Sequence, residues 1–127
     1  MDTNEFESLN KYIDVCIFNS THYDIAFVVH KYLKDKHRYV KNNTWEYLVD
    51  SEWLHDIKNV NLTYSIRTIV CSAFTQRSLY WADANNIEAG KYQDTEFISN
   101  KLLLIGLKLK ENKYISVLIK ECKQFFI

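Results

Sequence analysis

Hydrophobic positions recur at helical spacing in the first part of the chain. Over residues 5–18, Phe6, Leu9, Ile13 and Phe18 are separated by mostly polar residues, and a tyrosine stands beside them. Apolar residues three to five positions apart fall on one side of an α-helix. The pattern therefore predicts a first amphipathic helix over this stretch.

A second helix is predicted to begin at "STHYD". Ser20 or Thr21 can act as the N-cap, and Asp24 places a carboxylate in the first turn, near the positive end of the helix dipole. Cations in "KYLKDKHR" lie near the opposite, negative end. The apolar positions follow the order i, i+3, i+4, i+7, i+8: Ile25, Val28, Val29, Tyr32 and Leu33.

The period of the hydrophobic pattern changes to two between residues 38 and 55, in the segment that contains "NNTWEYLVDSEW". Alternation of apolar and polar residues is typical of a half-buried strand. Turns are expected at "NN" and "DS", whose residues tolerate turn dihedrals. We expect a β-hairpin. A third short strand over residues 38–41 is an alternative that the sequence does not decide. Trp45 and Trp53 would anchor it to the helices.

The rest of the chain again reads as helical. Asn61 can cap a long helix over residues 62–84, and Gly90 is a candidate helix stop in the polar segment that follows. Two further helices are predicted over residues 95–109 and 114–126. The predicted fold is a single domain of residues 1–127, mainly α with about five helices and a small antiparallel β-hairpin after the second helix.

Composition favours the same fold. The chain has a hydrophobic fraction of 47%, an aromatic fraction of 15%, no proline and two glycines, which predicts an ordered core built from long helices. The cysteines Cys16, Cys71 and Cys122 are far apart and odd in number, which indicates reduced core thiols. No apolar run has the roughly 20 residues of a membrane span. We expect a soluble, intracellular protein.

The formal net charge is zero, but the charges are unevenly distributed. Residues 25–41 contain five Lys or Arg against one acidic residue, and residues 101–127 contain six against two. Residues 42–62 contain one basic residue against four acidic ones. The two basic segments could form one patch that binds a polyanion, or they could be ordinary solvated helix faces.

The residues needed for familiar catalytic centres are missing from the pattern. Two isolated glycines do not make a phosphate-binding loop, and there is no Asp-x-Asp pair to hold two metal ions. His30 and His37 are seven residues apart and could share a helix face, but no His-x-x-x-His or Cys-x-x-Cys spacing supports a metal site. We expect a protein without catalytic residues, cofactor or metal.

Several segments carry a resemblance to a known family. They are "DIAFVVHKYLKDKHRYV", "NTWEYLVDSEW", "LTYSIRTIV" and "GLKLKENKYISVLIKECKQFF", in that order. Over residues 21–126 the chain resembles the helical linker domain between the primase and the superfamily 3 helicase in poxvirus-type primase-helicases of large DNA viruses, phages and plasmids. The separation of the two tryptophans and the terminal "IKECKQFF" are the most specific parts.

The resemblance implies a noncatalytic module of viral or phage DNA replication, which helps to position DNA or to dock the helicase. Its partners would be single- or double-stranded DNA, the helicase or primase domain, or a second copy, with no membrane. Its location would be the host cytoplasm or a viral replication site. The candidate phosphate contacts are Lys108, Lys110, Lys113, Lys120, Lys123 and Arg67. The candidate structural aromatic anchors are Trp45, Trp53, Phe125 and Phe126.

The chain departs from the family pattern in the hairpin. Where the family has His-Arg before the second tryptophan, this sequence has Ser51 and Glu52. DNA contact by the hairpin is therefore not expected. The alternative interpretation is a free-standing structural or interaction protein, such as a virion or adaptor protein, that uses exposed aromatic side chains as anchors.

Overall fold

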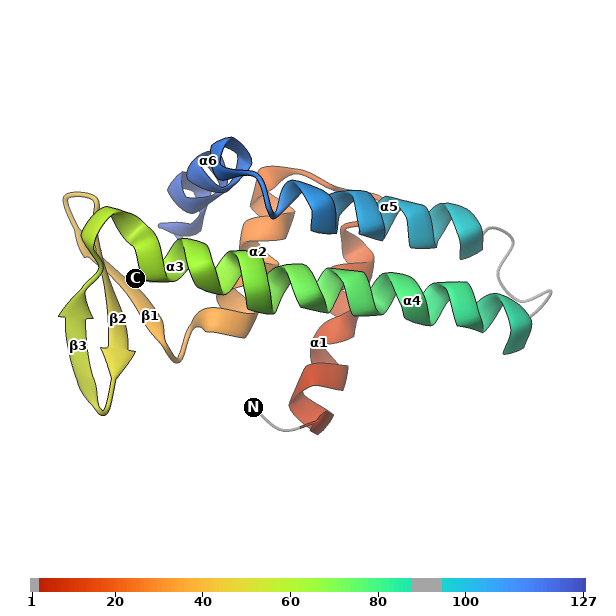
Figure 1. Cartoon of the computed structure of the whole chain (residues 1–127), viewed down its shortest axis with the longest axis horizontal. Coiled ribbons are helices and arrows are strands. Elements are labelled where there is room, and N and C mark those ends of the chain that lie inside the picture. The colour runs from red at the N-terminus through yellow and green to blue at the C-terminus, as the bar shows by residue number, and fades with distance from the viewer. Residues whose placement is uncertain (1–2, 88–94) are drawn as a thin grey trace.

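The computed structural model describes residues 3–87 and 95–127, with side chains described from residue 8 to 83 and from 95 onward. Gly90 lies outside the described residues. Within them the fold is mainly α, with a small antiparallel sheet after the second helix, as predicted (Figure 1). The elements are α1 (Thr3–Val15), α2 (His22–Leu33), β1 (His37–Lys41), β2 (Thr44–Val49), β3 (Glu52–His55), α3 (Val60–Ser65), α4 (Cys71–Ile87), α5 (Thr95–Lys108) and α6 (Asn112–Cys122).

The first two helices meet at a short connection. Thr21 is the N-cap of α2, and its hydroxyl accepts a hydrogen bond from the backbone N–H of Asp24 at 3.2 Å, which confirms the predicted helix start. Helix α1 ends earlier than predicted, at Val15, and Phe18 is 82% exposed. The chain turns after Val15 and buries Ile17 instead, so placing Phe18 on the apolar face was wrong.

The long third helix is present, but it contains a wider turn. Residues Ile66–Val70 form a π-helical segment between α3 and α4. Every fourth residue from 62 to 78 is buried, and the wider turn keeps these positions aligned on one side. They are Leu62, Ile66, Val70, Phe74 and Ser78.

The start of this helix corrects the predicted cap. Asp56, not Asn61, satisfies the first backbone donors, because its carboxylate accepts from the N–H of Asn61 at 2.9 Å and from the N–H of Leu62 at 2.8 Å. The Asn61 side chain donates to the same carboxylate. Asp56 is 1% exposed, and these three donors compensate for its desolvation.

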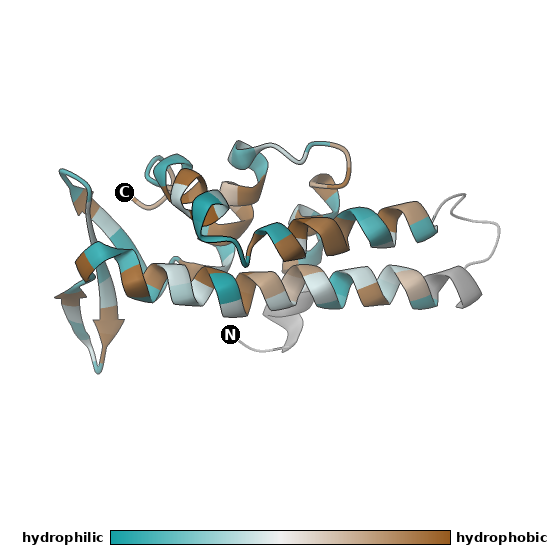
Figure 2. Cartoon of the chain, turned by 45° about the horizontal axis from the view of Figure 1, so that its top comes forward, coloured by the Kyte–Doolittle hydropathy of each residue, from teal (hydrophilic) through white to brown (hydrophobic). Residues whose placement is uncertain are grey.

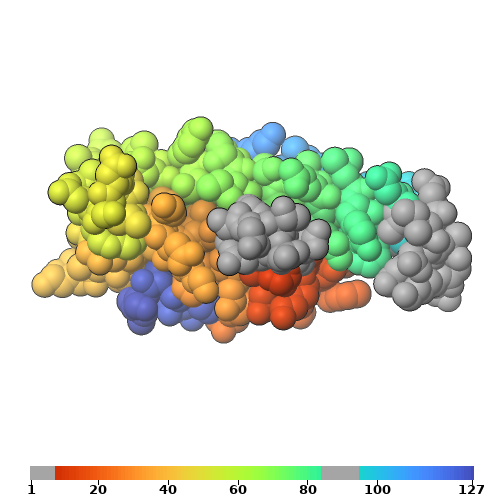
Figure 3. Space-filling view, turned by 90° about the horizontal axis from the view of Figure 1, so that it is seen from below, coloured from red at the N-terminus to blue at the C-terminus, as the bar shows by residue number. Residues whose placement is uncertain are grey.

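Helices α4 and α5 pack along each other and make the molecule elongated, with the sheet at one end (Figures 1 and 3). Ser78 and Ser99 link the two helices, each hydroxyl donating to the other residue's carbonyl oxygen, at 2.6 and 2.9 Å. Gly106 permits the close approach, because a Cβ there would lie 3.1 Å from the Thr75 hydroxyl oxygen.

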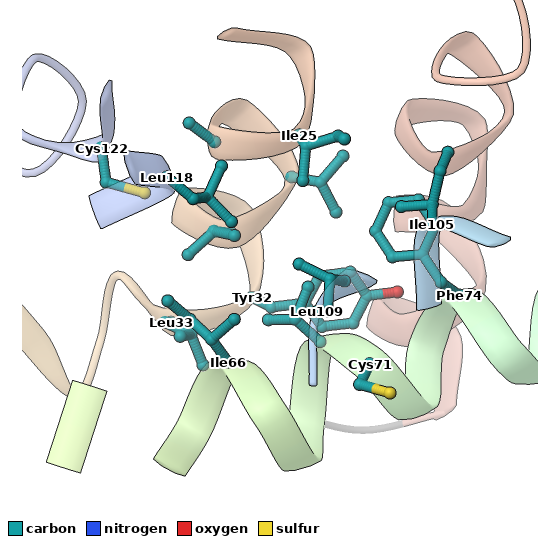
Figure 4. Close-up of a cluster of buried hydrophobic side chains, with 14 of the residues drawn as sticks. Ile25, Tyr32, Leu33, Ile66, Cys71, Phe74, Ile105, Leu109, Leu118 and Cys122 are labelled. Carbon is teal, nitrogen blue, oxygen red and sulfur yellow. The ribbon is translucent and has the colours of Figure 1, made fainter. Parts of the chain in front are cut away.

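The hydrophobic core joins segments from both ends of the chain. Side chains of α2, α4, α5, α6 and the π-helical segment meet in one cluster (Figure 4). All three cysteines are buried and free, as expected for reduced core thiols. The labelled members of the cluster are Ile25, Tyr32, Leu33, Ile66, Cys71, Phe74, Ile105, Leu109, Leu118 and Cys122.

Candidate nucleic-acid interface

The sheet is a meander in which β2 pairs with both neighbours. Its two turns are centred on Asn42–Asn43 and on Asp50–Ser51, and all four residues have positive φ, between 48° and 70°. Asn and Asp tolerate this left-handed region better than most residues. Because one turn precedes β2 and the other follows it, they lie at opposite ends of the strand, and only the first lies beside α6 (Figure 1).

The two tryptophans do not share a face of the sheet. Trp45 is 1% exposed, whereas Trp53 pairs across the sheet with Leu48, whose side chain points away from that of Trp45 by strand alternation. The Arg38 guanidinium carbon lies 4.3 Å from the Trp53 ring centroid. The expectation that both tryptophans anchor the sheet to the helices is therefore wrong for Trp53, because register places it on the other face.

Both C-terminal phenylalanines pack against α2, and Phe126 also packs against the sheet. Phe126 is 6% exposed, and its ring centroid lies 5.1 Å from that of Trp45 and 4.9 Å from that of His30. Phe125 contacts the rings of Tyr23 and Phe27 on α2, at 5.1 and 5.6 Å. Helix α6 ends at Cys122, whereas the predicted helix extends to residue 126. The last residues instead turn toward the sheet, where the backbone N–H of Tyr39 in β1 donates to the Phe126 carbonyl.

A pocket with basic walls lies between the first sheet turn, the segment before α3, α3 itself and α6. Its volume is about 260 Å³. The apolar part consists of Trp45 and Ile119, both buried. Among the described residues the polar part contains three lysines and no carboxylate: Asn43, Lys58, Asn59, Thr63, Ser116, Lys120 and Lys123.

One wall of this basic pocket is held by hydrogen bonds. The Lys123 ammonium donates to the side-chain oxygen of Asn43 and lies 5.5 Å from the ring centroid of Tyr39. The Tyr39 hydroxyl accepts from the backbone N–H of Asn43 at 3.0 Å. The turn and the end of α6 are thereby fixed relative to each other, and Lys123 is held at the pocket wall.

The predicted phosphate contacts separate into two groups. Lys120 and Lys123 line the basic pocket. Lys108, Lys110 and Lys113 are exposed around the connection from α5 to α6, which we call the basic corner. Residues 113, 116, 120 and 123 are spaced three or four apart, so the corner and the pocket share one side of α6 over about 15 Å.

Arg67 belongs to neither group. Its guanidinium donates to the side-chain oxygen of Asn112 at the start of α6, and its buried Nε has no acceptor among the described residues. Arg67 is half-buried in the π-helical segment. Its observed contact joins two helices, so the geometry gives it a structural role.

Sequence reasoning missed the other polar residues of the pocket, above all Lys58 and Asn59. Both have positive φ, 55° and 58°, in the connection from β3 to α3. The charge count over residues 42–62 is negative, which hides the single lysine of the segment, Lys58. A lysine followed by an asparagine just before a helix start was the available signal. Thr63 and Ser116 gave no signal, because their roles depend on how α3 packs beside α6.

The acidity of the hairpin is largely remote from this pocket. Glu46 forms an ion pair with Arg38 at 2.6 Å on the sheet face opposite Trp45. Asp56 is the exception, because its backbone N–H donates to the carbonyl of the pocket residue Trp45, but its carboxylate is buried and accepts from the first backbone donors of α3. Asp50 and Glu52 are at the far turn. The negative count of residues 42–62 therefore does not describe the charge at the Asn42–Asn43 end of the sheet.

A histidine–serine contact is the nearest approach to a catalytic arrangement. His37 Nε2 lies 2.9 Å from the Ser65 hydroxyl, but Nδ1 has no partner in the part of the chain that the structure describes, and the nearby Asp56 carboxylate is engaged with the start of α3. Burial lowers the pKa of His37, opposed by Asp56. His30 instead contacts Phe125 and Phe126, so the two histidines have different surroundings.

Over residues 8–83 and 95–127, whose side chains the structure describes, no three His, Cys, Asp or Glu residues are grouped so as to hold a metal ion. None of the helices described there is both long and apolar enough to cross a bilayer. Compared with known protein families, curated proteins and solved structures, the chain matches none.

Proposed function

We propose that the chain is a noncatalytic module of viral or phage DNA replication that binds the DNA phosphate backbone, as the resemblance to the primase-to-helicase linker implies. The basic pocket and the basic corner are the contact surface. One observation carries the proposal: lysines from two distant parts of the sequence, Lys58 and Lys120 with Lys123, line one pocket without a carboxylate. Phosphate contacts need cations and polar donors, which this surface supplies.

Titration of DNA at several salt concentrations tests this function. Fluorescently labelled single- and double-stranded oligonucleotides should bind, and log affinity should fall linearly with log salt, by about 0.7 per phosphate contacted for a single strand. Charge reversal at the basic corner, Lys108→Glu, Lys110→Glu and Lys113→Glu together, should weaken binding to every sequence. All three are exposed, so the fold should be retained.

The matched control reverses lysines at another exposed site. Lys34 and Lys36 are exposed at and after the end of α2 and line neither the basic pocket nor the basic corner, and Lys34→Glu with Lys36→Glu changes the net charge in the same direction by reversing two lysines instead of three. They should affect DNA affinity less than the corner variant does. Absence of binding at low salt, or equal losses in both variants, would refute DNA binding by this surface.

A second candidate function, docking on another protein, is favoured by α5. Its exposed side mixes polar residues with large apolar ones, although a helix exposed on one side is normally polar there (Figure 2). Four large side chains on this face are between 41% and 57% exposed: Phe97, Leu103, Leu104 and Leu107. Helicase or primase domains, or a second copy of the chain, are the partners that the resemblance implies.

Polar substitution on α5 tests the docking function. Leu104→Gln with Leu107→Gln should leave the free energy of unfolding nearly unchanged, because both side chains are more than half exposed. In sedimentation velocity, the variant should lose self-association or binding to a superfamily 3 helicase domain. A wild-type chain that stays monomeric and ignores the helicase would refute this function.

A further inference from the structure

We propose that the basic pocket is a specific site for a phosphomonoester group, the dianionic phosphate at the end of a nucleic-acid strand or on a nucleotide. The inference rests on the proposed function for placing this phosphate on DNA. It goes beyond that function because contacts along a continuous backbone need only an exposed line of lysines, whereas this pocket gathers donors from four segments around one space.

Charge favours a dianion. Lys58, Lys120 and Lys123 line the pocket and no carboxylate does, so an occupant with a single negative charge leaves more of the lysine charge uncompensated than a dianion does. A phosphomonoester carries about −1.5 to −2 charges at neutral pH and offers three strong acceptor oxygens. A phosphodiester within a strand carries one charge. The monoester therefore matches the lysine count better.

The neutral donors fit the same group. The pocket adds two amides, from Asn43 and Asn59, and two hydroxyls, from Thr63 and Ser116. Trp45 also lines the pocket. Amide and hydroxyl groups donate hydrogen bonds to phosphate oxygens, so these side chains can add to the contacts that the lysines make with the three acceptor oxygens of the group.

The size of the pocket allows more than the phosphate. At about 260 Å³, it holds the equivalent of roughly eight or nine water molecules at about 30 Å³ each. An oxyanion leaves part of this volume for the attached sugar. The shared chemistry is thus the monoester phosphate, whether it belongs to a free nucleotide or to the 5′ end of a strand.

The backbone before α3 places Lys58 at a conformational cost. Lys58 has φ 55° and ψ 22°, a left-handed conformation that is uncommon for lysine. Strain of this kind is often found at ligand sites. It also provides a variant that is safe for the fold: Lys58→Gly removes the cation and suits the backbone better, so any loss of binding cannot be attributed to unfolding.

The first test is a titration of the whole chain with inorganic phosphate, followed by the amide and indole signals in NMR spectra. Sodium chloride keeps the ionic strength constant. The Trp45 indole signal, which the variant Trp45→Phe identifies, should shift until the site is saturated, whereas the signals of Trp53 and Trp81 should not shift. Lys58→Gly and Lys120→Gln should each weaken phosphate affinity by about tenfold. Lys110→Gln, outside the pocket, should leave it unchanged. Shifts that never saturate, or equal loss in all three variants, would overturn the site.

The second test separates the sources of the phosphate. Wild type should bind a 5′-phosphorylated oligonucleotide about tenfold more tightly than the same oligonucleotide with a 5′-hydroxyl, and Lys58→Gly should abolish the difference. A nucleoside 5′-monophosphate that competes fully identifies the free nucleotide as a sufficient ligand. Equal affinity for both oligonucleotides would overturn the inference but leave DNA binding intact. Phosphate binding without DNA binding would refute the proposed function but support the pocket.

Discussion

Trp45 and Phe126, 81 positions apart in the sequence, pack edge to face with their ring centroids 5.1 Å apart. The contact joins the middle strand of the sheet to the C-terminal segment. It also lies beneath the basic pocket, since Trp45 forms part of the lining. The stability of the sheet and the shape of the pocket therefore depend on the same pair.

Truncation of Phe126 should destabilise the protein strongly. Phe126→Ala removes a buried ring that contacts Trp45 and His30, so the free energy of unfolding should fall by about 3–5 kcal/mol. Ile127→Ala is the matched control, because Ile127 is 86% exposed and its loss should cost less than about 0.5 kcal/mol. Urea unfolding measures both. Equal costs would contradict the packing.

Two ion pairs of similar length should differ in strength. Asp14 and Arg77 make two hydrogen bonds, at 2.7 and 2.9 Å, and Asp14 also accepts from the Trp81 indole at 3.1 Å. The Asp14 contact helps raise the pKa of Arg77, against the effect of burial. The two carboxylates are similarly exposed, but the Arg38 side chain is 47% exposed, against 15% for that of Arg77.

Double-mutant cycles with alanine should measure a larger coupling for the first pair. We expect about 1–3 kcal/mol for Asp14 with Arg77 and at most about 1 kcal/mol for Arg38 with Glu46. The reason is that burial reduces solvent screening of the first pair. A coupling in the Arg38–Glu46 pair as large as that of the buried pair would contradict this account.

Substitution of Gly106 should have an effect whose sign depends on Thr75. Gly106→Ala places a methyl group 3.1 Å from the Thr75 hydroxyl oxygen, so the gain of up to about 1 kcal/mol in helix propensity should be cancelled or reversed. In a Thr75→Ala background the same substitution should stabilise. Thermal unfolding of the four proteins tests this, and identical effects in both backgrounds would show that the contact is unimportant.

Stability should fall with acidification through the histidine range. Burial lowers the pKa of both His30 and His37 below the ordinary 6.5, with Lys31 and Lys34 adding to the effect at His30 and Asp56 opposing it at His37. The unfolded chain then binds more protons, so stability is lost as pH falls through this region. Urea midpoints from about pH 7.5 to about pH 5.5 should decrease, and less steeply in His37→Gln. A flat profile in the wild type would contradict the burial of neutral histidines.

The three thiols should be unreactive in the folded protein. Burial raises the pKa of Cys16 to about 12, with smaller effects from Asp24 and Asp14, and burial raises that of Cys122 as well. Because the thiolate is the nucleophile, an aromatic disulfide reagent should label the native protein slowly and should titrate three thiols after urea unfolding. A rapidly labelled thiol in the native state would show that one of them is accessible.

Local signals were sufficient for most of the secondary structure. The period of apolar residues and the cap at Thr21 predict α2, and the alternation around Trp45 with the Asn42–Asn43 and Asp50–Ser51 turns predicts the strands. These features involve residues close in sequence, whose spacing is independent of the rest of the fold. The errors lie at element ends: the prediction for Phe18 fails because α1 ends at Val15 and the chain turns to bury Ile17, and that for Asn61 fails because Asp56 accepts from the first backbone donors.

The candidate site was only partly predictable for the same reason. The sequence by itself determined a mainly helical fold, a small sheet, and a basic C-terminal segment that includes Lys120 and Lys123. Only the tertiary structure decided that Lys58 joins them, and that Trp45 faces the helices while Trp53 does not. Helical and strand periods set which side of an element a residue occupies. Long-range packing decides which sides meet, and that is what makes the basic pocket.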